Sequence, residues 1–326
     1  MEDNETYQNR IDLSPLKEGI ETIKREVGKI IIGQEKMVDL IIAAILTDGH
    51  ILIEGVPGVA KTLTSRIIAR LIKADFSRIQ FTPDLMPSDI LGTSVYNMKN
   101  SEFEFKKGPL FSNIILIDEI NRAPAKTQAA LFEVMEERQI TIEGHTYPMS
   151  APYMVLATQN PIDQEGTYRL PEAQLDRFMF KVSVKYPGLE DEINILKLHH
   201  EGTIAATFDA LDSVMVKEKI NEYRNLVSQI LVEEPLLRYI ATLVSETRTD
   251  ESLYLGGSPR ASLAILKGSK ALAAMRGRDF VTPDDIQAII YPALRHRIIL
   301  TPEREMEGIS PDEIIRQIIK RTEVPR

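Results

Sequence analysis

The feature that most constrains the fold of this chain is a glycine-containing loop between a short apolar run and a helical pattern. The loop reads Gly55-Val56-Pro57-Gly58-Val59-Ala60-Lys61-Thr62. It follows the apolar run at 50–54 and precedes the helical pattern at 63–72. This order of strand, loop and helix is the context that a phosphate-binding loop requires. The backbone N–H groups of such a loop, together with the N-terminus of the next helix, bind phosphate anions.

The side chains of the loop have separate expected roles. We expect Lys61 to contact the phosphates, the Thr62 hydroxyl to ligate Mg²⁺, and Leu63 to lie beside the nucleotide at the start of the helix. Ala60 stands where the general pattern has a second glycine. Because alanine is small, we expect a right-handed backbone to be tolerated there.

A second signal is the fully apolar run at 114–117, which ends in Asp118-Glu119. A buried parallel strand has this pattern, and ligand sites lie beyond the carboxyl ends of such strands. The run therefore predicts two carboxylates beside the loop. We expect Asp118 to hold Mg²⁺ through its water shell and Glu119 to polarise the attacking water. The alternative, that the acidic pair only caps the next helix, is disfavoured because loop and pair occur together in the expected order.

Composition limits the class of protein. The chain has 326 residues and a formal net charge of −9, which argues against general affinity for nucleic acids or anionic membranes. It has no cysteine, so disulfides and thiolate metal sites are excluded. No run approaches the ~18 apolar residues of a membrane span, and the polar start lacks the apolar region of a signal peptide. We therefore expect a cytoplasmic protein.

The order of elements predicts an α/β fold followed by helices. Strands are expected at 51–54, 79–81, 114–118 and 153–158, and their alternation with helices indicates a parallel sheet covered on both faces. Two hairpins are expected, at 92–109 and 139–149. After Pro187-Gly188 the pattern is helical throughout, with helices at 190–200, 214–231, 234–248, 259–275, 283–295 and 311–321. We predict an α/β domain over residues 1–187 and a helical domain over residues 188–326.

Several further segments carry a resemblance to a known family. They are the loop at 55–62 with its Ala60, and the segments 81–89, 107–111, 118–124, 157–161, 166–178 and 257–261. With these the chain resembles the AAA+ ATPases, and within them the MoxR family. The resemblance covers most of the chain. It implies a P-loop AAA+ parallel sheet sandwiched by helices, with a small all-α lid domain after it.

The resemblance also implies roles for single residues. Asn160 looks like sensor 1, although it could simply cap the turn at 161. Arg177 looks like an arginine finger offered to the neighbouring subunit, and its alternative is an ion pair with a nearby acid. Arg260 looks like sensor 2, reaching from the lid to the γ-phosphate. It stands at a helix start, where a cation is unfavourable unless an anion is near. Ile32-Gly33 resembles the segment that lines the adenine pocket, and the two hairpins resemble the helix-2 insert and the pre-sensor-1 hairpin.

The function implied by this resemblance is a Mg²⁺-dependent ATPase that binds and hydrolyses ATP in a homo-oligomeric ring, expected to be a hexamer. Hydrolysis would drive chaperone-like remodelling or maturation of a client or adaptor protein, in some relatives one with a von Willebrand factor A domain. The alternatives are a nucleic-acid translocase, a magnesium-chelatase-like metal-insertion subunit and a non-catalytic nucleotide switch. Mixed lysine and glutamate in the hairpins make nucleic acid a poor partner, and Glu119 argues against the switch.

Overall fold

The centre of the molecule is a five-stranded parallel sheet. The computed structural model describes residues 11–56, 58–160 and 170–325. The strands are β1 (Ile51–Gly55), β2 (Phe76–Gln80), β5 (Ile114–Asp118), β8 (Met154–Gln159) and β9 (Phe180–Val184), in the order β2-β5-β8-β1-β9. All neighbouring pairs are parallel, so the carboxyl ends of the strands meet at one edge. The expected parallel α/β sheet is confirmed.

The sequence located the three central strands and the end of β2, but it missed β9. β2 begins at Phe76 instead of 79, and β9 was not predicted at all. β9 alternates apolar and polar residues over five positions and β2 has only two apolar residues, whereas the central strands are nearly continuous apolar runs. Such short, partly polar segments have little signal of their own, because their strand conformation depends on pairing with a neighbour.

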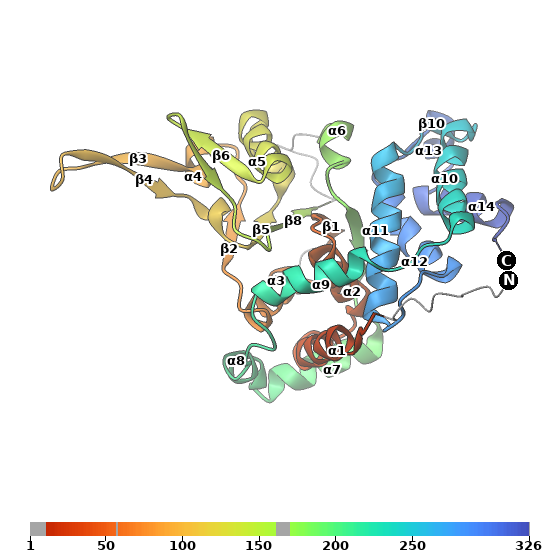
Figure 1. Cartoon of the computed structure of the whole chain (residues 1–326), viewed down its shortest axis with the longest axis horizontal. Helices are drawn as coiled ribbons and strands as arrows, with labels where there is room; N and C mark the ends of the chain where they lie inside the picture. Colours follow the sequence, from red (N-terminus) through yellow and green to blue (C-terminus); the bar gives the residue numbers. More distant parts are fainter. Residues whose placement is uncertain (1–10, 57, 161–169, 326) are drawn as a thin grey trace, which may run out of the picture.

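Helices cover both faces of the sheet. The helices α1 (Ser14–Gly28), α2 (Glu35–Leu46) and α3 (Lys61–Leu71) pack on one side, and α5 (Ala125–Glu137) packs on the other. In Figure 1, α1 and α3 lie below the strands and α5 lies above them. The short helix α4 (Pro87–Leu91) and the 3₁₀ turns η1 (Pro109–Phe111) and η2 (Ile120–Arg122) lie on the α5 side as well.

Strand alternation divides the core into two clusters. Successive side chains of a strand point to opposite faces. Ile114 and Leu116 therefore join the cluster that contains α1, α2 and α3, while Ile115 and Ile117 join the cluster with Phe132 of α5. Each apolar run of the central strands thus fills two cores at once, which explains why these runs are apolar at every position.

Two antiparallel hairpins interrupt the α/β pattern, as predicted. The first is formed by β3 (Gly92–Asn97) and β4 (Glu102–Lys107), and the second by β6 (Gln139–Ile142) and β7 (His145–Pro148). Figure 1 shows the β3–β4 hairpin projecting away from the rest of the molecule. The β6–β7 turn has positive φ at both central positions, Glu143 and Gly144, as tight hairpins require.

The second half of the chain is helical, with one short strand pair. Its helices are α7 (Leu189–His200), α8 (Thr203–Asp209), α9 (Glu218–Ser228), α10 (Glu234–Thr249), α11 (Pro259–Met275), α12 (Pro283–Leu294), α13 (Pro302–Met306) and α14 (Pro311–Arg321). The pair is β10 (Leu253–Leu255) with β11 (Ile299–Leu300). The pair, α8 and α13 were not predicted, and α9 begins four residues later than expected.

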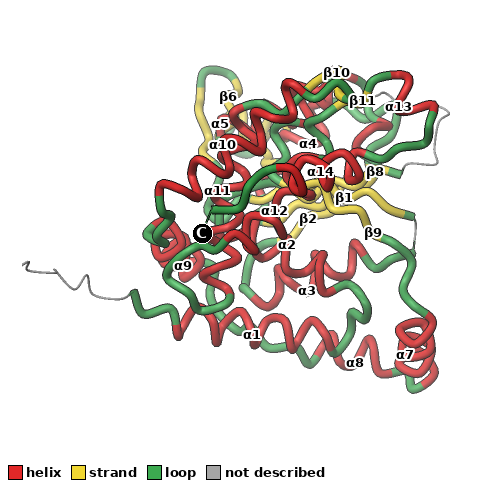
Figure 2. Tube along the Cα trace, turned by 90° about the vertical axis from the view of Figure 1, so that its right-hand side faces the viewer, coloured by secondary structure: helices red, strands yellow, loops and turns green. Residues whose placement is uncertain are grey.

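The helical half shares a core with the sheet. Buried residues of α11 and α12 belong to the same hydrophobic cluster as α1, α2 and strand β9. Figure 2 shows α10, α11, α12 and α14 in front of the strand layer. The division at residue 187 stays a prediction, because the cluster runs across it. Within the described part of the chain, every helix is too short or too polar to cross a bilayer.

One buried carboxylate fixes the start of α12. Asp285 is fully buried and accepts hydrogen bonds from Arg276, from both Nη atoms of Arg278, and from the backbone N–H and hydroxyl of Thr282. Thr282 and Asp285 therefore form a capping box at the start of α12. α14 has a capping box as well, in which Glu313 accepts from the Ser310 backbone N–H at 2.7 Å.

Candidate functional site

The loop between β1 and α3 has the backbone of an anion-binding turn. Gly58 has φ +87° in open space, and Ala60 has φ 58° and ψ 21°. Pro57 lies outside the described residues. The expectation of a right-handed Ala60 is wrong, because the residue is left-handed. That conformation costs an L-residue roughly 1–2 kcal/mol, and strain of this kind is characteristic of ligand sites.

Lys61 is the first residue of α3, and its ammonium group points back to the loop. Its Nζ donates to the Gly55 carbonyl at 2.6 Å. Partial burial lowers the pKa of Lys61, while the charges of Asp118 and Glu119 act in the opposite direction. The lysine is therefore within electrostatic reach of both carboxylates. The fold brings together the two segments that the sequence predicted to form one site.

Asp118 ends β5 and is held by both flanking strands. Its Oδ2 accepts from Arg78 Nε on β2 at 2.6 Å, and its Oδ1 accepts from the Thr158 hydroxyl on β8 at 3.3 Å. Sequence reasoning missed both partners. The available signal was the polar–apolar–polar pattern of residues 78–80, which places Arg78 and Gln80 on the same face of β2.

Glu119 is held in a strained conformation. It has φ 58° and ψ 52°, the left-handed region that carboxylate residues rarely occupy. Its backbone N–H donates to the Thr158 hydroxyl oxygen at 3.0 Å. Its Oε2 accepts from Gln80 Nε2 at 2.9 Å and lies 3.1 Å from Arg122 Nε. These contacts fix the carboxylate at the carboxyl edge of the sheet, where the sequence predicted a base.

Two further expected residues lie near this edge. Asn160 is half-buried and directly follows the last residue of β8. Gly33 has φ +73°, and a Cβ there would come 2.7 Å from Asp191 Oδ2 in the first turn of α7. The Ile32-Gly33 loop therefore lies against the first turn of α7.

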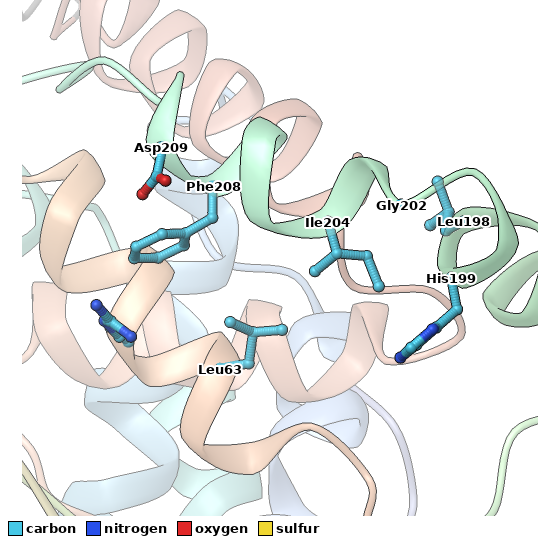
Figure 3. Close-up of a pocket in the computed structure, with 8 residues that line it drawn as sticks. Leu63, Leu198, His199, Gly202, Ile204, Phe208 and Asp209 are labelled. Carbon is cyan, nitrogen blue, oxygen red and sulfur yellow. The ribbon is translucent and has the colours of Figure 1, made fainter.

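A cavity of about 500 Å³ adjoins the start of α3 (Figure 3). Leu63, directly after the loop, lines one side of the cavity, and residues of α7 and α8 line the other. The Phe208 ring carries the Arg66 guanidinium 4.5 Å from its centroid. The lining residues are Leu63, Arg66, Leu198, His199, Gly202, Ile204, Phe208 and Asp209. Small-ligand sites have this size and are mostly apolar with a few polar groups.

Arg177 and Arg260, the two arginines expected to act on the phosphates, both form ion pairs with Glu136. Arg177 Nε is 3.2 Å from Glu136 Oε2, and Arg260 Nη2 donates to Glu136 Oε1 at 2.7 Å. The Arg177 contact is an ion pair without an aligned hydrogen bond. Glu136 lies in the last turn of α5, on the opposite side of the sheet from α3. Arg260 thus contacts the residue that holds Arg177.

The segment before Arg177 is fastened to the helical half. Asp176 accepts from the Ser258 hydroxyl at 3.0 and 3.1 Å and from Arg297 Nε at 2.7 Å. Ser258 is the N-cap of α11, the helix that carries Arg260. Arg177 and Arg260 are therefore held as one unit. The neighbouring family segment at 166–169, like residue 161, lies outside the described residues.

The donor groups of the loop and of β5 fit Mg²⁺ and a nucleotide. The described residues contain no group of three or more His, Cys, Asp or Glu side chains that could hold a metal by itself. Mg²⁺ is commonly held by one or two protein oxygens together with water and substrate phosphates. The Thr62 hydroxyl and the Asp118 carboxylate are oxygen donors of this kind, and the left-handed loop with Lys61 is suited to the phosphates.

Comparison with known proteins agrees with this geometry. The family of ATPases associated with various cellular activities (AAA) matches residues 50–180, and the AAA lid domain matches residues 245–318. Chaperone MoxR1 of Mycobacterium tuberculosis is 42% identical over 94% of this chain and 83% of its own. The uncharacterized protein YeaC of Bacillus subtilis is 44% identical over 96% of both chains.

A solved structure of a candidate ATPase from Cytophaga hutchinsonii superposes with a TM-score of 0.90 at 43% identity, covering 96% of this chain and 97% of that one. The fold, the phosphate-binding loop and the acidic pair at 118–119 all match what the family models and these relatives indicate. The chain belongs to the MoxR family of AAA+ ATPases, and its activity is ATP hydrolysis.

Proposed function

We propose that this ATPase works as a ring, expected to be a hexamer, and that it uses Mg²⁺-dependent ATP hydrolysis to remodel a partner protein. The observation that supports the proposal is that the residues expected to form one site lie in two separate groups within one chain. The loop, Lys61, Asp118 and Glu119 lie at the carboxyl edge of the sheet, whereas Arg177 and Arg260 are held by Glu136 of α5.

Each residue at the sheet edge has a distinct task in this proposal. Backbone N–H groups of the loop and Lys61 bind the phosphates, and Thr62 and Asp118 hold the metal, which neutralises phosphate charge when it is bound. Glu119 accepts a proton from the attacking water, and Asn160 orients that water. Gln80 keeps the Glu119 carboxylate in place until then. Leu63 and the Ile32-Gly33 loop border the base.

The arginine pair points to a second subunit. A phosphoryl-transfer site gains most from cations placed where charge develops, and an arginine finger is worth roughly 10³–10⁵ in rate. Arg177 and Arg260 are joined through Glu136 and through the Ser258–Asp176 contact. We infer that both serve the ATP of the neighbouring subunit. Such a contact is head-to-tail, and repeated head-to-tail contacts close into rings.

The β3–β4 hairpin supplies the surface for a partner. Tyr96 and Phe103 are cross-strand neighbours with ring centroids 5.3 Å apart, and they are 49% and 73% exposed. Phe105, by contrast, packs on Tyr147 of the second hairpin at 4.7 Å. The base of the hairpin is therefore anchored by Phe105, while Tyr96 and Phe103, closer to its tip, form an exposed aromatic pair. An exposed aromatic pair suits an unfolded or flexible polypeptide.

The charges of the hairpin favour protein over nucleic acid. Lys99, Lys106 and Lys107 are interspersed with Glu102 and Glu104, so the hairpin carries charges of both signs and has no continuous basic strip. A nucleic-acid translocase would need such a strip to bind the phosphate backbone. The name of the mycobacterial relative, a chaperone, agrees with a protein client. A von Willebrand factor A domain partner and a cytoplasmic location stay predictions.

The test uses the ATP-trapped ring. Glu119→Gln should hold ATP and retain its clients in cell extracts, where they can be identified by mass spectrometry. Adding Tyr96→Ser with Phe103→Ser should release those clients while nucleotide affinity stays unchanged. Tyr254→Ser is the matched control, because Tyr254 is an aromatic residue of the lid that is at least as exposed as Tyr96 and Phe103. Recovery of the same clients with the hairpin variant would reject the hairpin as the client surface.

A further inference from the structure

Arg78 makes an unusual contact for a residue on an edge strand. It is 54% exposed, yet its Nε lies 2.6 Å from Oδ2 of Asp118, whose side chain is only 13% exposed. Asp118 is the carboxylate proposed to hold Mg²⁺, and its other oxygen accepts from Thr158. The carboxylate proposed to hold the metal is therefore already paired with a cation in this structure.

The pairing has a physical reason. A largely buried carboxylate is costly unless a charge or several hydrogen bonds compensate it. The charge of Lys61 also acts on Asp118, while its Nζ donates a hydrogen bond to the Gly55 carbonyl. Arg78 comes from the neighbouring strand, where Gln80 is paired in register with Asp118. Its long, half-exposed side chain can contact Asp118 and also turn out to solvent.

We propose that Arg78 is the exchangeable counter-ion of Asp118 and that it competes with the divalent metal for this carboxylate. A divalent cation held by Asp118 and a guanidinium 2.6 Å from the same group repel each other. Metal binding and the Arg78 contact therefore oppose each other, and the coupling is reciprocal. Arg78 acts here as a positioning residue, which holds the Asp118 carboxylate in place between nucleotides and limits how tightly the metal is held.

A fixed supporting role predicts the opposite result. If Arg78 only oriented Asp118 for the metal, removing it would misplace the carboxylate and weaken metal binding. If it were an ordinary surface pair, removing it would change nothing. Competition alone predicts tighter metal binding without Arg78. The sign of the change in metal affinity therefore separates the three roles.

The experiment measures metal affinity without turnover. In the Glu119→Gln background, Mn²⁺ is titrated into protein with saturating ADP and free Mn²⁺ is followed by electron paramagnetic resonance. Arg78→Gln should lower the dissociation constant for Mn²⁺ about 5-fold or more, and Arg78→Lys should give a smaller decrease. ADP affinity measured in EDTA reports any direct effect of Arg78 on the nucleotide.

Arg238→Gln is the control for net charge. Arg238 is exposed on α10 and forms an ion pair with Glu234 one helical turn away, so its removal should leave the Mn²⁺ dissociation constant unchanged. Circular dichroism checks that each variant is folded. An unchanged or raised dissociation constant in folded Arg78→Gln would overturn the proposal, whether or not ATP hydrolysis is affected.

Discussion

Replacing Ala60 with glycine should stabilise the nucleotide-free protein. Ala60 has φ 58° and ψ 21°, a conformation that costs an L-residue roughly 1–2 kcal/mol and glycine almost nothing. Glycine also lowers the free energy of unfolding by about 0.4–1 kcal/mol, because it makes the unfolded chain more flexible. The midpoints of these two ranges leave a gain of about 0.8 kcal/mol in the free energy of unfolding.

A matched substitution in a regular helix should have the opposite sign. Ala129 is exposed in the middle of α5, where an Ala→Gly change costs about 1 kcal/mol. Urea unfolding monitored by circular dichroism gives both values from the shift in midpoint at constant slope. ATP binding should persist in Ala60→Gly, since the loop N–H groups remain. If Ala60→Gly destabilises the protein as much as Ala129→Gly, the strain assigned to the loop is not there.

Three other outcomes follow from the contacts described above. Glu119→Gln should bind ATP normally but lose most turnover, because an amide cannot accept the proton; substantial remaining hydrolysis would exclude it as the base. Asp285→Asn should cost about 3–5 kcal/mol because two arginines lose their buried partner, whereas Asp312→Asn, in a more exposed pair with arginine, should cost less than about 1 kcal/mol. Burial lowers the pKa of His50 and His296 well below the usual value, so the unfolded state binds more protons below about pH 6.5. The free energy of unfolding should therefore fall by about 1.4 kcal/mol per histidine between pH 7.5 and 5.5, and a flat profile would contradict their burial as neutral groups.

The sequence located the site where the local signal was strong. The run at 114–117 and the loop at 55–62 are specified by a few adjacent residues, and the structure places Asp118, Glu119 and Lys61 together. The capping boxes of α12 and α14 were also readable, because a cap depends on residues three positions apart.

The rest depends on contacts between distant segments. The left-handed backbone of Ala60 could not be predicted from the small size of alanine, because it is set by the geometry of the turn around it. Arg78 and Gln80 were missed because β2 is an edge strand whose neighbour is 40 residues away in sequence. The position of Arg260 depends on how α11 is fastened to Asp176 and Glu136, which no local pattern encodes.

The central claim is that each active site draws on two chains, and mixing two inactive variants tests it. Lys61→Ala and Arg177→Ala should each hydrolyse ATP very slowly alone. In an equal mixture, about one interface in four joins an intact Lys61 to an intact Arg177, so activity should return to about a quarter of the wild-type rate per site. The double variant mixed with either single variant is the control and should restore nothing. A mixture that stays inactive, although mixed rings are shown to form, would place Arg177 in the site of its own chain or in a structural role.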